Sequence, residues 1–159
     1  HLGKVYAIEA CGDSYNFLKI NAALNQLANI SIHHLAISDW VGKCKLYYDS
    51  GNWGHSIVKK FSSEYEIVEC KTLNNFFEDN EITSCNFIKF NCEWSEFPIL
   101  FNTTKKTFEC IDNMLILYHC DLWSKHTESD LIKHLQANGF QCIICNQSLT
   151  RGWIVAKRF

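Results

Sequence analysis

The sequence predicts an α/β fold built on a mostly parallel sheet, and three observations lead to this prediction. Short apolar runs alternate with segments of helical periodicity along most of the chain. Several of these runs are apolar throughout, which is typical of parallel strands covered on both faces. With 159 residues, 47% of them hydrophobic and 20% charged, the chain suits one globular domain with a sizeable core. We therefore expect a single domain over residues 1–159.

The first part of the chain predicts a strand, a helix and a second strand. Residues 3–9, GKVYAIE, form an apolar run that ends on an acid. Asp13 is placed to cap a helix over residues 14–28. ISIHHLAIS, residues 30–38, is the next expected strand. The apolar residues of the helix recur at helical spacing and share one face: Phe17, Ile20, Leu24 and Leu27.

The rest of the chain continues this alternation. Helices are expected at residues 72–80 and 128–138, the second with Thr127 and Asp130 in capping-box register and Gly139 at its end. Because only a short polar loop, NQSLTR, separates the last two strands, we expect that pair to be antiparallel. The remaining expected strands are residues 44–49, 65–71, 86–93, 113–121, 140–145 and 152–158.

Charge and cysteine usage exclude several classes of function. The formal net charge is −2 with no basic stripe, so neither nucleic acid nor an anionic membrane surface is an expected partner. Sequence runs of 18 apolar residues, which a membrane span needs, do not occur. We interpret the nine cysteines as buried free thiols of a cytoplasmic protein. Cys142 and Cys145 have a chelating spacing, but a strand would point them to opposite faces, and no metal site is expected.

Polar residues follow the downstream ends of the predicted strands. In open parallel sheets, ligands bind at this edge of the sheet. Helix capping explains any one of these residues taken alone, and a histidine at a strand end is often only a satisfied core group. The residues in question are Glu9, Ser38, Asp39, Asn91, Glu93, Glu96, His119 and Asp121.

Several segments, in the right order, resemble the FkbM-type family of S-adenosylmethionine-dependent O-methyltransferases. GKVYAIEA is similar to the family's second strand, G-x-V-x-A-F-E-P, and NAALNQLANISIHHLAISDWVGK to its N-x-x-L-N helix and a third strand ending in A-L-S-D. GNWGHS resembles a Gly/Ser loop. NFIKFNCEWSEFPIL resembles the diagnostic segment D-F-I-K-I-D-V-E-G-x-E. The resemblance implies a Rossmann-like class I sheet with S-adenosyl-L-methionine as cofactor.

The resemblance also implies roles for individual residues. Glu9 would bind the ribose hydroxyls, Ser38 and Asp39 would lie beside the adenine, and Asn91 would lie next to the sulfonium methyl. The implied catalytic residues are Asn91, Glu93 and His119, and either His119 or Asp121 would act as general base for the acceptor hydroxyl. The implied acceptor contacts are Trp53, His55, Trp94, Glu96 and Asp121. For Glu96, an equally good interpretation is that it opens the following helix.

Three departures from the family pattern bear on function. The family's opening strand and its Gly-rich loop, D-x-G-A-N-x-G, are absent, so we expect a fragment that lacks its N-terminal strand and helix. The family's Asp is Asn91 here, and an amide takes up no proton. The family's Gly is Trp94, whose indole either fills the acceptor pocket or stacks on a sugar face.

The resemblance predicts an enzyme in the complete protein. Its substrate would be a hydroxyl of a sugar, glycan or small metabolite, and it would be fused to or act with enzymes of glycan biosynthesis. The alternative is a degenerate, non-catalytic module that keeps the methyltransferase fold for interaction or glycan binding.

Overall fold

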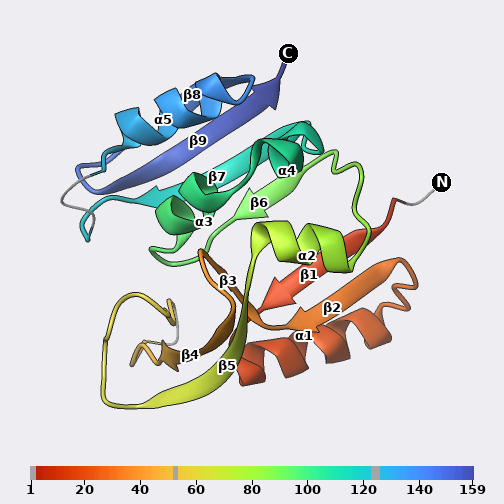
Figure 1. The fold of residues 1–159 in the computed structure, drawn as a ribbon. Coiled ribbons are helices and arrows are strands. Elements are labelled where there is room, and N and C mark those ends of the chain that lie inside the picture. The colour runs from red at the N-terminus through yellow and green to blue at the C-terminus, as the bar shows by residue number, and fades with distance from the viewer. Residues whose placement is uncertain (1–2, 52–53, 123–125) are drawn as a thin grey trace. The chain divides into compact units, whose positions relative to one another are not determined.

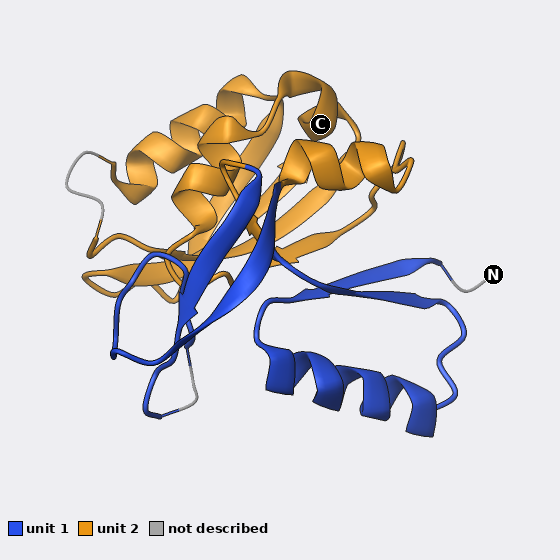
Figure 2. Ribbon diagram, turned by 60° about the horizontal axis from the view of Figure 1, so that its bottom comes forward, with its two compact units in different colours: residues 1–36, 41–71 blue, residues 37–40, 72–159 orange. Residues whose placement is uncertain are grey.

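The computed structural model describes residues 3–51, 54–122 and 126–159. The chain folds into helices and strands that alternate along most of its length (Figure 1). It divides into two compact units (Figure 2): unit 1 contains residues 1–36 and 41–71, and unit 2 contains residues 37–40 and 72–159. No helix in the described part of the chain is both long and apolar enough to cross a membrane.

Unit 1 contains a parallel strand pair and an antiparallel one. Strand β1 (Val5–Glu9) pairs in parallel with β2 (Ile30–His34), and helix α1 (Gly12–Leu24) connects them. Strand β4 (Gly42–Tyr47) pairs antiparallel with β5 (Tyr65–Thr72). This arrangement of strand, helix and parallel strand is the connection that the sequence predicted for residues 3–38.

Helix α1 differs from its prediction in two respects. Its N-cap is Cys11 rather than Asp13, which lies in the first helical turn. The predicted apolar face points to solvent, since Phe17 is 66% and Leu24 75% exposed, whereas the buried residue of the helix is Ala22. The periodicity of an amphipathic helix identifies its apolar face, but not whether another element covers that face.

The expected strand over residues 30–38 is split in two. Leu35, which is buried, separates β2 from β3 (Ala36–Ser38). The two strands belong to different sheets, and β2 takes its place beside β1. A continuous apolar run therefore does not guarantee one continuous ladder.

Unit 2 contains a four-stranded sheet in the order β6-β7-β9-β8. Strand β6 (Ile88–Phe90) is parallel to β7 (Asn113–His119), and β9 (Arg151–Arg158) lies antiparallel between β7 and β8 (Phe140–Cys145). The antiparallel C-terminal pair is confirmed. Antiparallel pairing extends further than expected, because β9 also pairs with β7 and because β4 pairs with β5.

Helices pack on one face of this sheet. They are α2 (Leu73–Asp79), α3 (Glu96–Asn102), α4 (Lys105–Glu109) and α5 (Glu128–Ala137). Buried and less buried residues alternate along β7 and β9, as the pleat requires, and the fully buried ones include Met114, Ile116 and Ile154. On the opposite face Ile143 is 65% exposed, so the expectation that both faces are covered is not met within this unit.

The nine cysteines are free thiols. Only Cys11 and Cys70 are buried, and Cys145 is exposed, so the expectation of burial holds for two of them. Cys142 and Cys145 are three residues apart on β8, and adjacent strand residues alternate between faces, so their side chains diverge as predicted.

Candidate functional site

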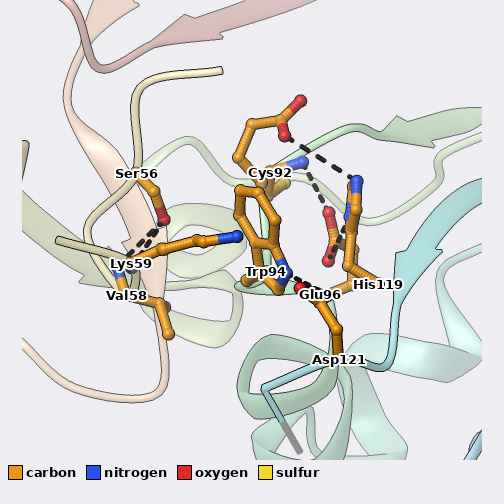
Figure 3. Close-up of polar contacts among 9 residues, drawn as sticks. Ser56, Val58, Lys59, Cys92, Trp94, Glu96, His119 and Asp121 are labelled. Atoms are coloured by element: carbon orange, nitrogen blue, oxygen red, sulfur yellow. Dashed lines mark hydrogen bonds and ion pairs between the residues drawn. The ribbon is translucent and has the colours of Figure 1, made fainter. Parts of the chain in front are cut away.

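The carboxyl ends of two neighbouring strands in unit 2 bring five of the predicted residues together. Because β6 and β7 are parallel, the segments that follow them leave the sheet at the same edge. The segment after β6 supplies Glu93, Trp94 and Glu96, while β7 and the residues after it supply His119 and Asp121. Figure 3 shows Trp94, Glu96, His119 and Asp121 close together.

Glu96 is the best buried acid of this cluster. It is the first residue of α3 and has no exposed surface. The backbone N–H of Cys92 donates to its Oε1 atom at 2.9 Å, and Nδ1 of His119 lies 3.4 Å from its Oε2 atom. A buried carboxylate is costly unless it is paired, so these two contacts explain why it is tolerated here.

His119 lies between two carboxylates. Its Nδ1 atom faces Glu96, and its Nε2 atom is 3.7 Å from Oε2 of Glu93. Burial by itself lowers the pKa of His119, but the hydrogen bond and charge of Glu96, with the charges of Glu93 and Asp121, outweigh this effect. The net result is a pKa above the ordinary histidine value, so the imidazolium form is stabilised here.

Trp94 packs against the imidazole of His119. The two rings have centroids 4.8 Å apart and planes tilted by 37°. The indole N–H donates to the carboxylate of Asp121, as Figure 3 shows. Trp94 is only 9% exposed. The indole N–H is thus bound to Asp121, and the indole ring packs against the imidazole of His119.

The backbone at this point is unusual. Glu93 and Trp94 have φ angles of 45° and 74°, in the left-handed region that favours glycine. For a bulky residue such as tryptophan this conformation is strained. The turn redirects the chain between β6 and α3 and places consecutive side chains of the segment around His119.

Cys92 lies in the same turn, and the pKa of its thiol is raised. Burial raises the pKa of its thiol, and the nearby charge of Glu96 raises it further. The thiol therefore stays protonated at neutral pH.

A second polar feature of unit 2 is a hollow of about 340 Å³ beside Asp39. The amide of Asn102 donates to the backbone carbonyl of Asp39, and the hydroxyl of Ser38 donates to its carboxylate. Phe101 and His126 form part of the wall, with ring centroids 4.7 Å apart. The remaining wall residues are Phe97 and Pro98. An aromatic wall next to a carboxylate suits a flat group that carries a hydrogen-bond donor.

A larger hollow of about 540 Å³ lies in unit 1, between α1 and β2. Its wall consists mainly of small and aliphatic side chains, among them Ala22, Ala23 and Ile32. Its wall includes no carboxylate or histidine, and its titratable side chains are those of Tyr15 and Lys19. It arises because α1 turns small residues toward the strand while its large apolar residues are exposed.

Residues 1–142 match the model of the family described as "Methyltransferase FkbM domain". This match covers more than half of the chain. The chain belongs to the FkbM methyltransferase domain family. Among curated proteins, no sequence matches it.

A solved structure described as "METTL16 MTase domain (crystal form 2)" is similar to this FkbM domain, with a TM-score of 0.51 and 14% sequence identity. The similarity covers 98% of the present chain and 50% of the other, so the chain spans half the length of that domain. At this identity the likeness establishes the fold, which is the predicted methyltransferase-type α/β fold.

The φ angle of Trp94 gives a physical reason for the glycine of the family pattern. A glycine at this position adopts a φ of 74° at no steric cost, and tryptophan adopts it only under strain. Asn91, which replaces the family's Asp, is exposed just after β6. It is therefore close in sequence to the cluster around His119, but it is not one of the residues that surround the imidazole.

Unit 1 of the FkbM domain contains two further predicted residues. Glu9 ends β1, and its Oε1 atom accepts from the backbone N–H of Cys11 at 2.9 Å, while Glu66 accepts in the same way from Gly12. Glu9 thus stabilises the start of α1, the simpler of the two interpretations, and a carboxylate retains capacity for other donors. His55 accepts from the backbone N–H of Asp49 within its own loop. Trp53 lies outside the described residues.

Sequence reasoning missed three contributors to these sites. Phe101 and His126 line the hollow beside Asp39, and the backbone N–H of Cys92 binds Glu96. No motif marks the two aromatic residues, because they lie far from Asp39 in the sequence and line the same hollow only in the folded chain. Among residues 3–51, 54–122 and 126–159, no group of three or more His, Cys, Asp or Glu side chains is arranged to hold a metal ion.

Proposed function

We propose that the protein carrying this chain is an S-adenosylmethionine-dependent O-methyltransferase that acts on a hydroxyl of a sugar, glycan or small metabolite. Membership of the FkbM family supports the reaction class. The observation that carries the proposal is the pairing of His119 with the fully buried Glu96 at the carboxyl edge of the parallel strands.

This pair has the geometry of a general base with an orienting acid. In neutral His119, an Nδ1–H group that donates to Glu96 leaves the lone pair on Nε2. Nε2 can then take the proton of an acceptor hydroxyl. Because the carboxylates raise the pKa of His119, the imidazolium that forms is stabilised by Glu96 and Glu93.

The residues beside Asp39 fit the adenine end of the cofactor. Bound S-adenosylmethionine supplies an electrophilic methyl group. Phe101 and His126 offer ring faces for a flat heterocycle, and the carboxylate of Asp39 can accept from an exocyclic amino group. The volume of about 340 Å³ is at the lower end of the range for ligand pockets. Glu9 remains the residue proposed to bind the ribose hydroxyls.

We also propose a cytoplasmic location and an association with glycan-biosynthesis enzymes. Free thiols at all nine cysteines are compatible with a reducing compartment. A fully buried Glu96 positions His119 rather than touching the acceptor. The acceptor contacts that remain proposed are those of Trp53, His55, Trp94 and Asp121.

The second candidate function is a non-catalytic module of the same fold. Trp94 is the observation in its favour, because its indole packs against His119 where the family pattern has glycine. Asn91, which cannot take up a proton, adds to this argument.

A calorimetric titration of S-adenosylmethionine into the full-length protein tests whether it is a methyltransferase or a non-catalytic module. We expect micromolar binding that weakens at least tenfold in Glu9→Ala and in Asp39→Ala. Glu69→Ala is the matched control, because it removes an exposed carboxylate that pairs with Lys43 on the neighbouring strand. Its affinity should equal that of the wild type.

Two results together would support the enzyme. The wild type should bind S-adenosylmethionine, and His119→Gln should lose methyl transfer while it keeps its affinity for the cofactor. A well-folded full-length protein that binds no cofactor would overturn the methyltransferase proposal and leave the non-catalytic module.

A further inference from the structure

Strand β8 forms an open edge of the sheet of unit 2. It is the outermost strand in the order β6-β7-β9-β8 (Figure 1). Within the part of the chain that the structure describes, it pairs with β9 alone. An edge strand keeps a row of backbone N–H and C=O groups on its outer side, and a strand of another molecule can pair with that row.

The pairing with β9 identifies which backbone groups of β8 face outward. Along a strand of an antiparallel ladder, successive residues direct their N–H and C=O groups alternately to one side and the other. The N–H of Phe159 donates to the carbonyl of Gly139, whereas the N–H of Arg158 points away from β8 and donates to Asp112. Gly139 and every second residue after it therefore face β9. The outward residues of β8 are Phe140, Cys142 and Ile144.

This edge has none of the common features that prevent pairing between molecules. The sequence of β8, FQCIIC, contains neither a charged residue nor proline. Ile143, on the face of the sheet opposite the helices, is 65% exposed. Strand β4, an edge strand of unit 1, instead carries Lys43 and Lys45. Because natural sheets block their edges with lysine or proline, an apolar and uncharged edge favours a strand as its partner.

A second copy of β8 fits this edge in one antiparallel register. With Cys142 opposite Cys142 of the second copy, Phe140 lies opposite Ile144, and all outward residues of the strand are paired. A shift of two residues in either direction brings Asn138 or Asn146 into the ladder. Asn138 is the C-cap of α5, and Asn146 has a φ of 50°, so neither is extended. The outward groups are thus symmetric about Cys142, as a two-fold contact requires.

We propose that β8 pairs with β8 of a second copy of this chain in an antiparallel, two-fold symmetric dimer. The pairing joins the two four-stranded sheets into one continuous sheet, with Cys142 at the symmetry axis. Gln141 of each copy lies opposite Ile143 of the other, on the exposed face. Because one strand per copy makes a small interface, the dimer is reversible.

The first arm of the test is analytical ultracentrifugation of the full-length protein over a series of concentrations. We expect the wild type to dimerise with a dissociation constant in the micromolar range. Gln141→Lys combined with Ile143→Lys places like charges opposite each other, so the dissociation constant should rise about tenfold. Gln141→Glu combined with Ile143→Glu should have the same effect. An equimolar mixture of the two double variants should dimerise again, because opposite charges then face each other.

A matched control separates this contact from a general effect of charge. Ser129→Lys combined with Gln136→Lys adds the same two charges at exposed positions of α5. Its dissociation constant should equal that of the wild type. Since Gln141 and Ile143 are exposed as well, all variants should keep the circular dichroism spectrum of the wild type.

The second arm follows hydrogen exchange of single amides of the wild type by NMR, and so requires no variant to fold. In dilute protein, the outward amides of Cys142 and Ile144 should exchange about tenfold faster than the amide of Ile143, which bonds to β9. Raising the concentration above the dissociation constant should slow Cys142 and Ile144 by about tenfold and leave Ile143 nearly unchanged.

Three results would overturn the proposal. The first is a wild type that stays monomeric at millimolar concentration. The second is self-association that neither double variant weakens, because another surface would then hold the dimer. The third is slow exchange of Cys142 and Ile144 in the dilute monomer, because another part of the full-length protein would then cover this edge.

Discussion

At the scale of single residues, the turn between β6 and α3 concentrates both strain and charge. Glu93 and Trp94 adopt left-handed φ angles, and the next residues place Glu96 against His119. The backbone N–H of Ser95 donates to the carbonyl of Cys92, and the N–H of Cys92 donates to Glu96. These two hydrogen bonds connect residues within the turn. They explain how a conformation that is unfavourable for each residue alone is held in the folded chain.

The strain at Trp94 predicts that truncation to glycine costs less stability than truncation to alanine, the reverse of the usual order in a helix. Trp94→Ala loses the packed indole and keeps a side chain at a φ of 74°, whereas Trp94→Gly loses the indole but relieves the backbone. We expect the glycine variant to be more stable than the alanine variant by about 1 kcal/mol. Urea unfolding of both variants measures the difference in the free energy of unfolding.

Gln136, an exposed residue of α5, is the control position. There the ordinary order should hold, with the glycine variant less stable than the alanine variant by about 1 kcal/mol. A Trp94→Ala variant as stable as Trp94→Gly would mean that the positive φ is not imposed by the fold.

His119 predicts a dependence of stability on pH. Its folded-state pKa lies above the ordinary value of 6.5, so its contribution is full below pH 6.5 and is lost as pH rises through the raised pKa. The free energy of unfolding of the wild type, minus that of His119→Asn, should therefore be larger at pH 6 than at pH 9. Urea unfolding at several pH values measures this difference.

His134 is the matched control because burial lowers its pKa below 6.5. The folded state then binds fewer protons than the unfolded chain, so stability falls as pH drops below 6.5 toward the lowered pKa. The corresponding difference for His134→Asn should shrink at acidic pH. If the two differences in unfolding free energy changed with pH in the same direction, the two histidines would not have pKa values shifted in opposite directions.

At the scale of elements, threonine side chains begin three helices of unit 2. The hydroxyls of Thr72, Thr104 and Thr127 accept from backbone N–H groups at the starts of α2, α4 and α5. At α5 the cap is reciprocal, since Asp130 accepts from the backbone N–H of Thr127. Helix α1 has no such side chain at Cys11, and the carboxylates of Glu9 and Glu66 bind its first N–H groups instead.

The capping box of α5 predicts the cost of removing its threonine. Thr127→Ala leaves an N–H group at the helix start without its side-chain acceptor, and we expect a loss of about 1 kcal/mol in the free energy of unfolding. Chemical denaturation measures it. Ser129→Ala, at an exposed position in the first turn of the same helix, should leave stability nearly unchanged. Equal losses in the two variants would argue against the cap.

At the scale of the whole molecule, the two units differ in how completely they bury their apolar residues. In unit 2, residues of β7, β9 and α5 have no exposed surface: Met114, Ile116, Ile154, Ala156, Leu131 and Leu135. In unit 1 the large apolar residues of α1 are exposed, and a hollow lies between this helix and β2. Regions with few buried apolar contacts open at lower free energy than a packed core.

This contrast predicts the pattern of amide hydrogen exchange. Exchange of amide protons, corrected for intrinsic rates, should be slowest in β7 and β9 and fastest among the regular elements in α1. Mass spectrometry of peptides from each unit measures it. Protection of α1 equal to that of β7 would mean that the apolar face of this helix is covered in solution, and would contradict the prediction.

Most elements of the fold were predictable because their signals are local. The strand at Val5–Glu9, the helix of Glu128–Ala137 with its capping box, and the antiparallel C-terminal strands follow from apolar periodicity, side-chain caps and a short polar loop. The end of that helix at Gly139 was equally visible, since its φ of 88° suits glycine. Such signals depend on residues within a few positions of each other.

The sequence by itself determined the fold class, the family motifs and the list of polar residues at strand ends. Only the tertiary structure decided that Glu93, Glu96 and His119 meet, because β6 and β7 are neighbours through a parallel pairing between distant segments. It also decided that α1 exposes its apolar face, and that Trp94 lies against His119. These are long-range contacts, and their free energies depend on which elements pack together rather than on any local pattern of residues.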